Sequence, residues 1–523
     1  MSNLLDEARM LDRFRRGLRV FLRAPLSLAE AKQALESYVA SRERRFLDLL
    51  EAAVYRQSRS PWLELLRHAQ IELGDIRQLI QRDGIESTLG KLHGAGVYLT
   101  AGEARGKEPV IRNGTEIHLR PEDLDNPVLP GSFPALTSGS SGPRRRLLID
   151  FALLEHDVRA HRLFLQAYDL EHRPLAIWRP VPPGAAGLKH VIQHARLGVP
   201  AEKWFSQTDP SLRAGPTKSW LFLRTALATA RSSGRLVPPP EYLPLGGAAV
   251  IAEWLAARRR EGTGAHLDTM VSSAIRVCQA ARERGLDIAG TFFRVGGESL
   301  TESRAEVLRS AGASFACNYS MSETGPIGVA CASAAEADAV HLLSGKIAIL
   351  TKPGPDGRNA LLLTTLLASA PRILLNVESG DSAIIENRSC GCPFGALGYC
   401  THLHTIRSYE KVSGEGVYFL GAEFAALVED FLPRSFGGAP TDYQFVHERH
   451  GEFHRVRLMI SAQVGDLEVP DVREAVLKRL AVASRGDEMK SKIWASGDVL
   501  VVERGEPMAT PGSKIPAVRF DGR

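Results

Sequence analysis

Apolar runs alternate with helical patterns between residues 147 and 300, and this alternation constrains the fold more than any other feature of the sequence. The stretch contains LLIDFALLEHDVRAHRLFLQAY, AAVIAEWLAARRR, HLDTMVSSAIRVCQAARERG and LDIAGTFFRVGG. Short apolar runs followed by amphipathic helices are typical of strand–helix–strand units around a largely buried sheet. The sequence therefore predicts a large α/β domain, which we expect to span residues 91–407.

The two ends of the chain have a different character. Residues 1–90 carry apolar residues at helical spacing and are predicted to form a helical segment, in which Ser60 caps a helix that begins at Pro61. After Gly414 the runs EFHRVRLMISAQV, VPDVREAVLKRLAVAS and DVLVVER predict a small, separate α+β domain over residues 408–523. Several domains are expected, because 523 residues exceed the size at which one hydrophobic core stops growing.

Composition and charge argue against several classes of protein. The net charge of +5, from 65 basic and 60 acidic residues, is too small to indicate a nucleic-acid surface. Charged residues throughout the first 32 positions argue against a signal peptide or a membrane span. Six cysteines in a chain without a secretory signal indicate reduced thiols. We therefore expect a cytoplasmic protein, monomeric or homodimeric, with no nucleic-acid or membrane partner.

A polar, glycine-rich loop follows an apolar approach at residue 136. The loop consists of Thr137, Ser138, Gly139, Ser140, Ser141 and Gly142. Small hydroxyl side chains and exposed backbone N–H groups suit a loop that wraps polyphosphate oxygens, and the arginines at positions 144–146 add charge for pyrophosphate. A flexible Ser/Gly linker explains the same residues about equally well. No Gly-Lys-Ser/Thr follows, so this is not a P-loop.

Two further motifs lie where strands are expected to end. Gly296, Gly297 and Glu298 form a tight turn after the run FFRV, at the kind of strand-to-helix junction where α/β sheets bind ligands. The second motif runs from Tyr319 to Glu323 and offers an aromatic face for a purine, a hydroxyl for a phosphate or carboxylate, and a hard oxygen ligand for Mg²⁺. Taken alone, Gly-Gly-Glu is usually just a turn, and a surface turn with a buried Tyr explains the second motif about equally well.

In order and spacing, these motifs resemble the adenylate-forming enzymes, and within them the phenylacetate-CoA ligase-like branch. The resemblance covers roughly residues 95–523 and adds three segments: Ser379-Gly380-Asp381, the hinge-like Arg407-Ser408-Tyr409-Glu410, and Thr510-Pro511-Gly512-Ser513-Lys514-Ile515-Pro516. It implies a large α/β domain followed by a small, mobile C-terminal α+β domain. It also implies a ligase that uses ATP, Mg²⁺ and coenzyme A.

The resemblance implies a role for each matching residue. The nucleotide would be bound at its phosphates by residues 137–142, at its ribose by Asp381 and Arg407, and at its adenine by Gly297, Glu298 and Tyr319. Gly296 of the same turn is also implied in cofactor binding. The residues implied in catalysis are Ser322 on the adenylate phosphate, Glu323 as the Mg²⁺ ligand, and Lys514 at the reacting centre. Mg²⁺ and Lys514 would offset the repulsion between the two anions that the reaction joins.

The chain departs from the family pattern at three places. The phosphate loop ends in Pro-Arg-Arg where many members have Lys, Glu378 stands where the branch usually has Arg, and Tyr409-Glu410 replaces two aspartates of the hinge. The first change keeps the charge of the loop but alters its geometry. The other two bear on the second half-reaction, in which the small domain normally rotates to admit the thiol.

Cysteines and histidines gather at close spacing outside the nucleotide motifs. Tetrahedral Zn²⁺ takes four Cys or His ligands, and some relatives in the phenylacetate-CoA ligase-like branch carry zinc on a Cys…His…Cys-x-Cys pattern. The matching residues, which would hold a structural Zn²⁺, are Cys331, His341, Cys390 and Cys392, with Cys400 as a substitute ligand. The alternative is a set of unligated buried thiols.

The acyl pocket is expected to be lined by residues 269–275 and 318–321, with a contribution from residues 182–188. These segments show no obvious cation for a second carboxylate, so a monocarboxylic aryl or acyl acid is favoured over a diacid. His190 and His194 stand at i, i+4 spacing and could face one ligand, but the interpretation we favour is a solvated helix face.

The sequence therefore predicts ATP-dependent activation of a small-molecule carboxylic acid to an acyl-adenylate, followed by transfer to coenzyme A. One alternative passes the acyl group to the phosphopantetheine of an acyl carrier protein, or to an amine. Another is a nucleotide-binding protein of the same fold without turnover. Lys514 argues against that last possibility, because a non-catalytic protein has no physical need for a lysine in the loop Thr-Pro-Gly-Ser-Lys-Ile-Pro.

Overall fold

A 12-stranded sheet forms the centre of the protein and carries most of the predicted site residues. The computed structural model describes residues 2–129, 133–136, 146–149, 151–182, 186–207, 218–321, 323–353, 359–408, 411–415, 417–438, 440–482, 485–508, 515 and 517–521. The strand order is β13-β14-β15-β16-β12-β11-β10-β9-β8-β5-β6-β7. Within the described residues, no helix is long and apolar enough to cross a membrane.

One half of the sheet is parallel and confirms the predicted α/β architecture. Its strands are β5 (Leu175–Trp178), β6 (Lys203–Ser206), β7 (Pro240–Tyr242), β8 (His266–Asp268), β9 (Phe292–Gly296) and β10 (Ser314–Met321). The connecting helices are α7 (Phe151–Ala167), α8 (Ala186–Leu197), α9 (Lys218–Ser232), α10 (Ala248–Arg260), α11 (Val271–Glu283) and α12 (Glu302–Ser310). Side chains alternate between the faces of the sheet, so Phe292 packs with α7 and α8 while Phe293 packs with α10 and α11.

The other half of the sheet is antiparallel and curls. It runs from β10 through β11 (Gly325–Ala330), β12 (Val340–Leu342), β16 (Thr401–Ser408), β15 (Val377–Asn387), β14 (Asn359–Thr365) and β13 (Ile347–Pro353). Tyr319 on β10 donates a hydrogen bond of 2.8 Å to Asp381 on β15, four places away in the strand order. In a flat sheet those strands would stand about 19 Å apart. The antiparallel half therefore folds round and brings its far strands over β10.

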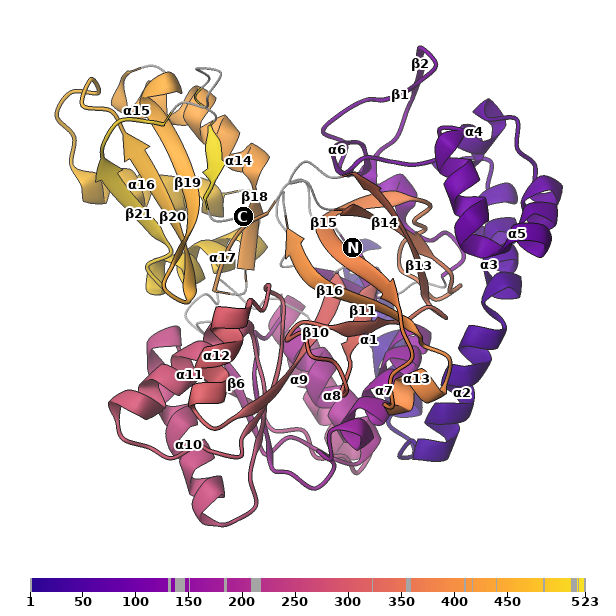
Figure 1. The fold of residues 1–523 in the computed structure, drawn as a ribbon, viewed down its shortest axis with the longest axis horizontal. Helices are drawn as coiled ribbons and strands as arrows, with labels where there is room; N and C mark the ends of the chain where they lie inside the picture. Colours follow the sequence, from indigo (N-terminus) through magenta and orange to yellow (C-terminus); the bar gives the residue numbers. More distant parts are fainter. Residues whose placement is uncertain are drawn as a thin grey trace.

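Helices of the N-terminal segment cover the sheet on one side (Figure 1). They are α1 (Ser2–Phe21), α2 (Leu28–Ala40), α3 (Arg42–Leu50), a π-helical turn (Glu51–Tyr55), α4 (Pro61–His68) and α5 (Leu73–Gly94). Helix α4 begins at Pro61 after Ser60 at the N-cap position, as predicted. Trp62 is buried and donates its indole N–H to the Ile373 carbonyl at 2.9 Å, so this helix is anchored directly on the antiparallel half.

Several short elements lead from this segment to the parallel half. They are α6 (Ala101–Ala104), β1 (Val110–Arg112), β2 (Thr115–Ile117), a 3₁₀ turn (Pro121–Leu124), β3 (Phe133–Leu136) and β4 (Arg146–Ile149). The hairpin of β3 and β4 frames the predicted phosphate loop, whose residues 137–142 lie outside the described part of the chain. These two antiparallel strands come immediately before α7 in the chain.

The C-terminal part forms a separate four-stranded sheet, drawn in yellow in Figure 1. Its strand order is β21-β20-β19-β22, with β19 (Tyr443–His450), β20 (Phe453–Ile460), β21 (Leu500–Arg504) and β22 (Val518–Phe520). The other elements are β17 (Lys411–Gly414), β18 (Val417–Leu420), α14 (Gly421–Ala426), a π-helical turn (Leu427–Phe431), α15 (Leu432–Phe436), a 3₁₀ turn (Pro440–Asp442), α16 (Val469–Ala481) and α17 (Arg485–Ser496). The helix and strand patterns predicted here are confirmed. The domain boundaries at residues 90 and 407 stay predictions.

A buried ion pair joins α11 to the C-terminal part. Arg276 donates two hydrogen bonds to the Glu415 carboxylate, at 2.9 and 2.7 Å, and the Glu415 side chain is 1% exposed. The Arg276 guanidinium also lies 4.7 Å from the centre of the Phe453 ring. Burial raises the pKa of Glu415, and Arg276 opposes that rise. The Glu415 carboxylate has no water to replace its partner and depends on Arg276, whose side chain is 23% exposed.

Arg276→Met should destabilise the protein more than the double change Arg276→Met with Glu415→Met. The single change leaves a buried carboxylate unpaired, at about 3–5 kcal/mol, whereas the double change removes both charges. In the single variant, burial alone would hold the pKa of Glu415 above its usual 4.5. A carboxyl with a raised pKa in the folded state loses stability as the pH rises above its unfolded pKa. The melting temperature of Arg276→Met should therefore fall further below that of the wild type at pH 8 than at pH 5. An equal difference at the two pH values would contradict this assignment.

Candidate active site

Tyr319 and Asp381 meet at the inner face of the curled sheet. Tyr319 is 9% exposed and Asp381 5% exposed, and the 2.8 Å hydrogen bond between them is buried. The Asp381 backbone N–H also donates to Ser379 Oγ at 3.1 Å, and Gly380 between them has φ +80, a conformation that glycine adopts without strain. The two residues that the sequence assigns to adenine and ribose are thus neighbours, although 61 residues separate them in the chain.

The Gly-Gly-Glu turn lies beside the strand that carries Tyr319. Gly296 ends β9 opposite Asn318 on β10, and a Cβ added at Gly296 would stand 2.9 Å from the Asn318 carbonyl oxygen. Glu298 reaches the first turn of α11, where one carboxylate oxygen accepts the Ser272 backbone N–H at 2.8 Å. Its second oxygen, Oε1, is buried and has no hydrogen-bond partner among the described residues. The turn is therefore packed tightly, and its carboxylate caps a helix rather than standing alone in solvent.

Arg407 lies one strand from Asp381 but contacts a different carboxylate. In the register of β15 and β16, Asp381 stands opposite Ser408 and Ser382 opposite Arg407. The Arg407 guanidinium donates to Asp338 at 2.8 Å, and Asp338 also accepts the backbone N–H groups of residues 405 and 406. Glu378, the departure next to this strand position, accepts a hydrogen bond from Lys352 at 3.0 Å. The Glu378 carboxylate, at a position where the branch usually has Arg, is therefore paired with Lys352.

Four predicted groups lie outside the described residues. They are the phosphate loop 137–142, Ser322, Lys514, and Tyr409 with Glu410 of the hinge. Glu323 is described, is partly buried, and lies in the turn between β10 and β11. Just beyond it, a Cβ added at Gly325 would stand 3.0 Å from Asp157 Oδ2 and 3.3 Å from Lys346 Nζ. The turn that carries Glu323 thus packs directly against the buried Asp157–Lys346 ion pair.

The sequence analysis missed a buried charge cluster at the carboxyl ends of β5, β8 and β9. Asp268 accepts hydrogen bonds of 2.5 Å from both Arg179 and Arg294, and its second oxygen also lies 2.7 Å from His190 Nδ1. Asp268 is fully buried and the two arginines are 7% and 9% exposed. The arginines hold the pKa of Asp268 well below its usual value, against the effect of burial. The pKa of His190 is lowered to about 4, chiefly by burial, so its imidazole is neutral at pH 7.

The prediction that His190 and His194 lie on a solvated helix face is wrong. His194 has no exposed surface, and its ring centre lies 4.5 Å from that of His161 and 6.0 Å from that of His266. The i, i+4 spacing does place both residues on one face of α8, but that face is covered by α7 and the sheet. The two histidines therefore belong to the interior of the parallel half.

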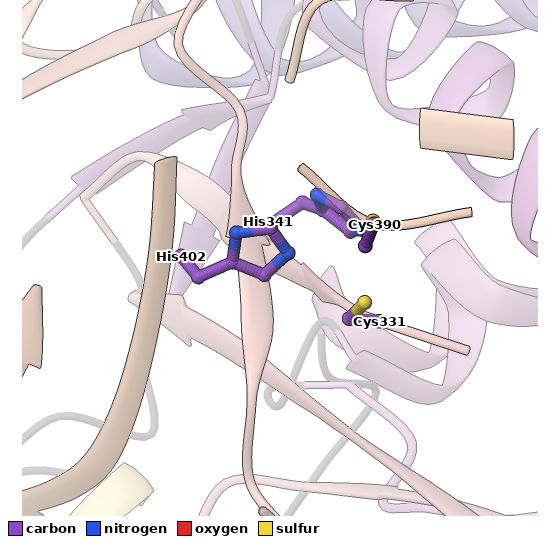
Figure 2. A group of neighbouring side chains, drawn as sticks. All are labelled: Cys331, His341, Cys390 and His402. Carbon is purple, nitrogen blue, oxygen red and sulfur yellow. Dashed lines mark hydrogen bonds between the residues drawn. The ribbon is translucent and has the colours of Figure 1, made fainter. Parts of the chain in front are cut away.

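The Cys and His residues singled out in the sequence come together at one point. Ligand atoms of Cys331, His341, Cys390 and His402 all lie within 4.8 Å of one another (Figure 2). Cys392 joins the same cluster, because its Sγ lies 2.9 Å from His341 Nε2 and 3.4 Å from Cys390 Sγ. A tetrahedron with Zn–S bonds of about 2.3 Å has edges of about 3.8 Å. The spacing thus fits a metal ion of this size.

The hydrogen bonds around the cluster also fit a metal site. His341 Nδ1 lies 2.6 Å from the Tyr399 carbonyl oxygen, and His402 Nδ1 lies 2.9 Å from the Cys400 carbonyl oxygen. A carbonyl only accepts, so each Nδ1 carries the proton and each Nε2 presents a lone pair to the cluster. Second-shell partners of this kind orient metal-binding histidines. Cys331, His341 and Cys390 belong both to the predicted ligand set and to the set of atoms within 4.8 Å of one another, and these two sets differ in having Cys392 or His402 as the fourth ligand.

Cys400 does not join the cluster. It is exposed and lies just before β16, whereas His402 within that strand is buried. The proposed substitute ligand at Cys400 is therefore replaced by His402, which belongs to the same short segment. Four protein ligands leave no open position, so a Zn²⁺ held here would be structural.

Comparison with known proteins identifies the fold. No family model matches the chain, and no curated protein sequence does. Among solved structures, 2-hydroxyisobutyryl-CoA ligase, in complex with 2-HIB-AMP and CoA in the thioesterification state, is similar over 95% of this chain and 92% of its own, with a TM-score of 0.51 and 16% identity. This chain has the adenylate-forming fold.

A second structure is similar over most of both chains. The amide bond synthetase McbA from Marinactinospora thermotolerans is matched over 91% of this chain and 98% of its own, with a TM-score of 0.43 and 13% identity. The similarity to the first of these structures confirms the adenylate-forming fold predicted from the motifs. Membership of the phenylacetate-CoA ligase-like branch stays a prediction.

Within the adenylate-forming fold, the Cys/His cluster ties the ends of β11, β12 and β16 to the loop before α13 (Pro393–Ala396). The purified protein should contain about one Zn²⁺ per chain. Cys390→Ser should lower the melting temperature by about 10 °C or more, because the binding energy of a structural zinc is folding energy. Cys400→Ser, which removes an exposed thiol of the same segment, should change it little. Metal analysis that finds no zinc after purification without chelators would contradict the assignment.

Proposed function

We propose that this protein uses ATP to convert a carboxylic acid to an acyl-adenylate and then transfers the acyl group to coenzyme A. The observation that carries the proposal is the buried Tyr319–Asp381 hydrogen bond inside an adenylate-forming fold. These are the two residues that the family resemblance assigns to adenine and ribose, and they come from strands that only the curled sheet brings together. A nucleoside bound there would be held next to the Gly-Gly-Glu turn and the turn that carries Glu323.

The proposed chemistry has one demanding step, in which a carboxylate oxygen attacks the α-phosphorus of ATP and pyrophosphate leaves. Two anions approach each other, so the transition state needs positive charge near the carboxylate and the phosphoryl oxygens. Glu323 would hold Mg²⁺, which supplies part of that charge when bound. Lys514 would supply the rest from the C-terminal part, Ser322 would donate to the phosphate, and residues 137–142 would wrap the leaving pyrophosphate.

Coenzyme A is the acceptor we propose, in a second step in which its thiol attacks the acyl carbon and AMP leaves. The similar 2-hydroxyisobutyryl-CoA ligase structure contains both an acyl-adenylate and CoA, and its similarity extends over 95% of this chain. The branch usually has Arg at the position of Glu378. Here Lys352 pairs with the Glu378 carboxylate, so this residue adds no unpaired negative charge that would oppose the step. A carrier-protein phosphopantetheine or an amine would replace coenzyme A without changing the first step.

A panel of carboxylic acids, assayed for pyrophosphate release with and without coenzyme A, tests the proposal. Without a thiol, a productive acid should release about one pyrophosphate per protein and then stop, because the adenylate stays bound. With coenzyme A, release should continue and an equal amount of AMP and thioester should form. Failure of every acid to release pyrophosphate would contradict the proposed function. Turnover only with a carrier protein or an amine would reassign the acceptor and leave the first step intact.

A further inference from the structure

A cavity of about 260 Å³ lies at the amino ends of the parallel strands, between α7, α8 and the sheet. It is bounded by the first residues of β5 and β8, by the residue before β6, and by the loops that follow α7 and α8. The Gly-Gly-Glu turn follows the carboxyl end of β9, which runs parallel to β8, so the cavity lies at the opposite edge of the sheet. None of the described residues assigned to the nucleotide lines it.

The inner wall of the cavity combines apolar side chains with two histidines. Leu165, Leu170 and Leu175 line it and are buried. His194 on α8 and His266 at the start of β8 are its only buried polar lining residues, and they are 0% and 1% exposed. Their ring centres lie 6.0 Å apart. Two imidazoles from separate elements therefore meet beside the same cavity.

Both histidines have ring nitrogens without a hydrogen-bond partner. These atoms are Nδ1 and Nε2 of His194 and Nε2 of His266, and all are buried. Burial lowers the pKa of His194 well below its usual value and the pKa of His266 to about 3, so both rings are neutral at pH 7. A neutral imidazole offers one N–H donor and one bare nitrogen that accepts. His194 thus leaves a donor and an acceptor unsatisfied, which destabilises a fold unless a ligand supplies the missing partners.

The spacing of the side chains does not suit a metal ion. Within the described part of the chain, the Cys/His cluster around Cys331 is the only place where three or more metal-binding atoms lie within 4.8 Å of one another. The residues of this cavity do not form such a group. An organic ligand therefore fits the cavity better than a cation held by the two histidines.

The charges of the outer wall are already balanced by neighbours. Glu171 lies 3.3 Å from Arg162 and Glu202 lies 3.9 Å from Arg258, while Arg173 donates to a backbone carbonyl at 3.0 Å. The inner wall carries no charge, because both imidazoles are neutral. A charged group that entered it would lose water without gaining a counter-charge. The ligand group that meets the histidines is therefore uncharged.

We propose that this cavity binds a small uncharged amide or lactam, whose N–H and carbonyl pair with the two buried imidazoles. An amide offers one donor and one acceptor side by side, which is what a neutral imidazole lacks here. The nitrogens have almost no accessible surface, so the rings would turn toward the cavity as the ligand enters. The volume lies just below the range of about 300–1,000 Å³ that is usual for ligand pockets, which favours a small molecule. The inference is independent of the proposed function.

A pair of closely related lactams tests the inference. 2-Pyridone has both the carbonyl and the N–H, whereas N-methyl-2-pyridone keeps the carbonyl and lacks the donor. Calorimetry on the full chain should show 2-pyridone binding at one site with a Kd of about 1 mM or tighter. N-methyl-2-pyridone should bind at least about tenfold more weakly, because a bare ring nitrogen then stays unpaired.

His194→Leu and His266→Leu should each weaken 2-pyridone binding at least about tenfold. Neither change should lower the melting temperature of the free protein, because leucine removes an unsatisfied buried polar group. His161→Leu is the matched control. His161 is buried with Nε2 unpartnered, and its ring centre lies 4.5 Å from that of His194, yet it does not line the cavity. It should leave binding unchanged.

Three results would overturn the inference. They are the absence of saturable 2-pyridone binding to the wild type, equal binding of the two pyridones, and binding that survives both leucine substitutions at the cavity. The pyridone comparison uses the wild type alone, so it decides the question even where a variant fails to fold. None of these measurements depends on pyrophosphate release, so the proposed function stands or fails separately.

Discussion

Glu323→Gln is expected to reduce acyl-adenylate formation at ordinary Mg²⁺ concentrations to below the limit of detection, at least 100-fold. The change keeps the shape and volume of the side chain but removes an anionic oxygen ligand, which Mg²⁺ strongly prefers. Glu323 lies in a turn that packs against the buried Asp157–Lys346 ion pair. Contacts other than those of its own carboxylate therefore hold the backbone of this turn in place. The variant should therefore fold and melt like the wild type.

Pyrophosphate release over a range of Mg²⁺ concentrations measures this effect. Part of the lost activity should return at high Mg²⁺, because the change weakens metal binding rather than the fold. Glu253→Gln provides the control, since Glu253 forms an exposed ion pair with Arg284 on the surface. Pyrophosphate release by Glu323→Gln at the wild-type rate would show that Glu323 is not the Mg²⁺ ligand.

Lys514→Ala is expected to slow acyl-adenylate formation by two orders of magnitude or more, while transfer from a supplied acyl-adenylate to coenzyme A changes much less. In the first step, a carboxylate and a phosphate are joined, and a cation between them stabilises the transition state more than the separated anions. In the second step, the thiol attacks an ester-like carbon and AMP leaves. By then, in the family cycle, the C-terminal domain has moved Lys514 away, and a cation absent from a transition state cannot stabilise it.

Two assays separate these steps. The first follows pyrophosphate release from ATP and acid, and the second follows thioester formation from synthetic acyl-adenylate. Lys492→Ala, which removes an exposed lysine of the same C-terminal part, should leave both rates unchanged. Equal loss in both assays would assign Lys514 to the fold or to a different cycle, and equal retention would show that it takes no part in catalysis.

Much of the fold could be predicted because local patterns report on local structure. The start of α4 follows from proline at the first helical position, and β20 follows from the alternation of apolar and polar residues, both of which act within a few residues. The curl of the antiparallel half could not be predicted in this way. It depends on contacts such as Trp62 with the Ile373 carbonyl, which join residues 311 positions apart.

The candidate site shows the same division. The motifs around Tyr319 and Asp381 could be recognised in sequence, but their contact depends on the order of five strands. The Asp268 cluster could not be recognised, because each member comes from a different element and none belongs to a motif. Spacing placed His190 and His194 on one helix face, yet which face of α8 is buried depends on its packing against α7 and the sheet.

The Cys/His cluster could be predicted in part from the sequence. Close spacing of Cys390, Cys392 and the residues around 400 marked the segment, and the structure brings it to Cys331 and His341. The sequence favoured Cys400 as the substitute ligand, whereas in the structure Cys400 is exposed and the buried His402 lies in the cluster. Close spacing along the chain marked the segment, but which of its side chains is buried depends on the packing of the folded chain.

Transfer of oxygen from the acid to AMP tests the central claim most directly. The acid would be labelled with ¹⁸O in its carboxylate and incubated with the protein, ATP and coenzyme A. If the carboxylate attacks the α-phosphorus, one labelled oxygen stays with the phosphate when the thiol displaces it, so mass spectrometry should find AMP with one ¹⁸O and pyrophosphate with none. Label in inorganic phosphate with release of ADP, or thioester formation without labelled AMP, would contradict adenylation.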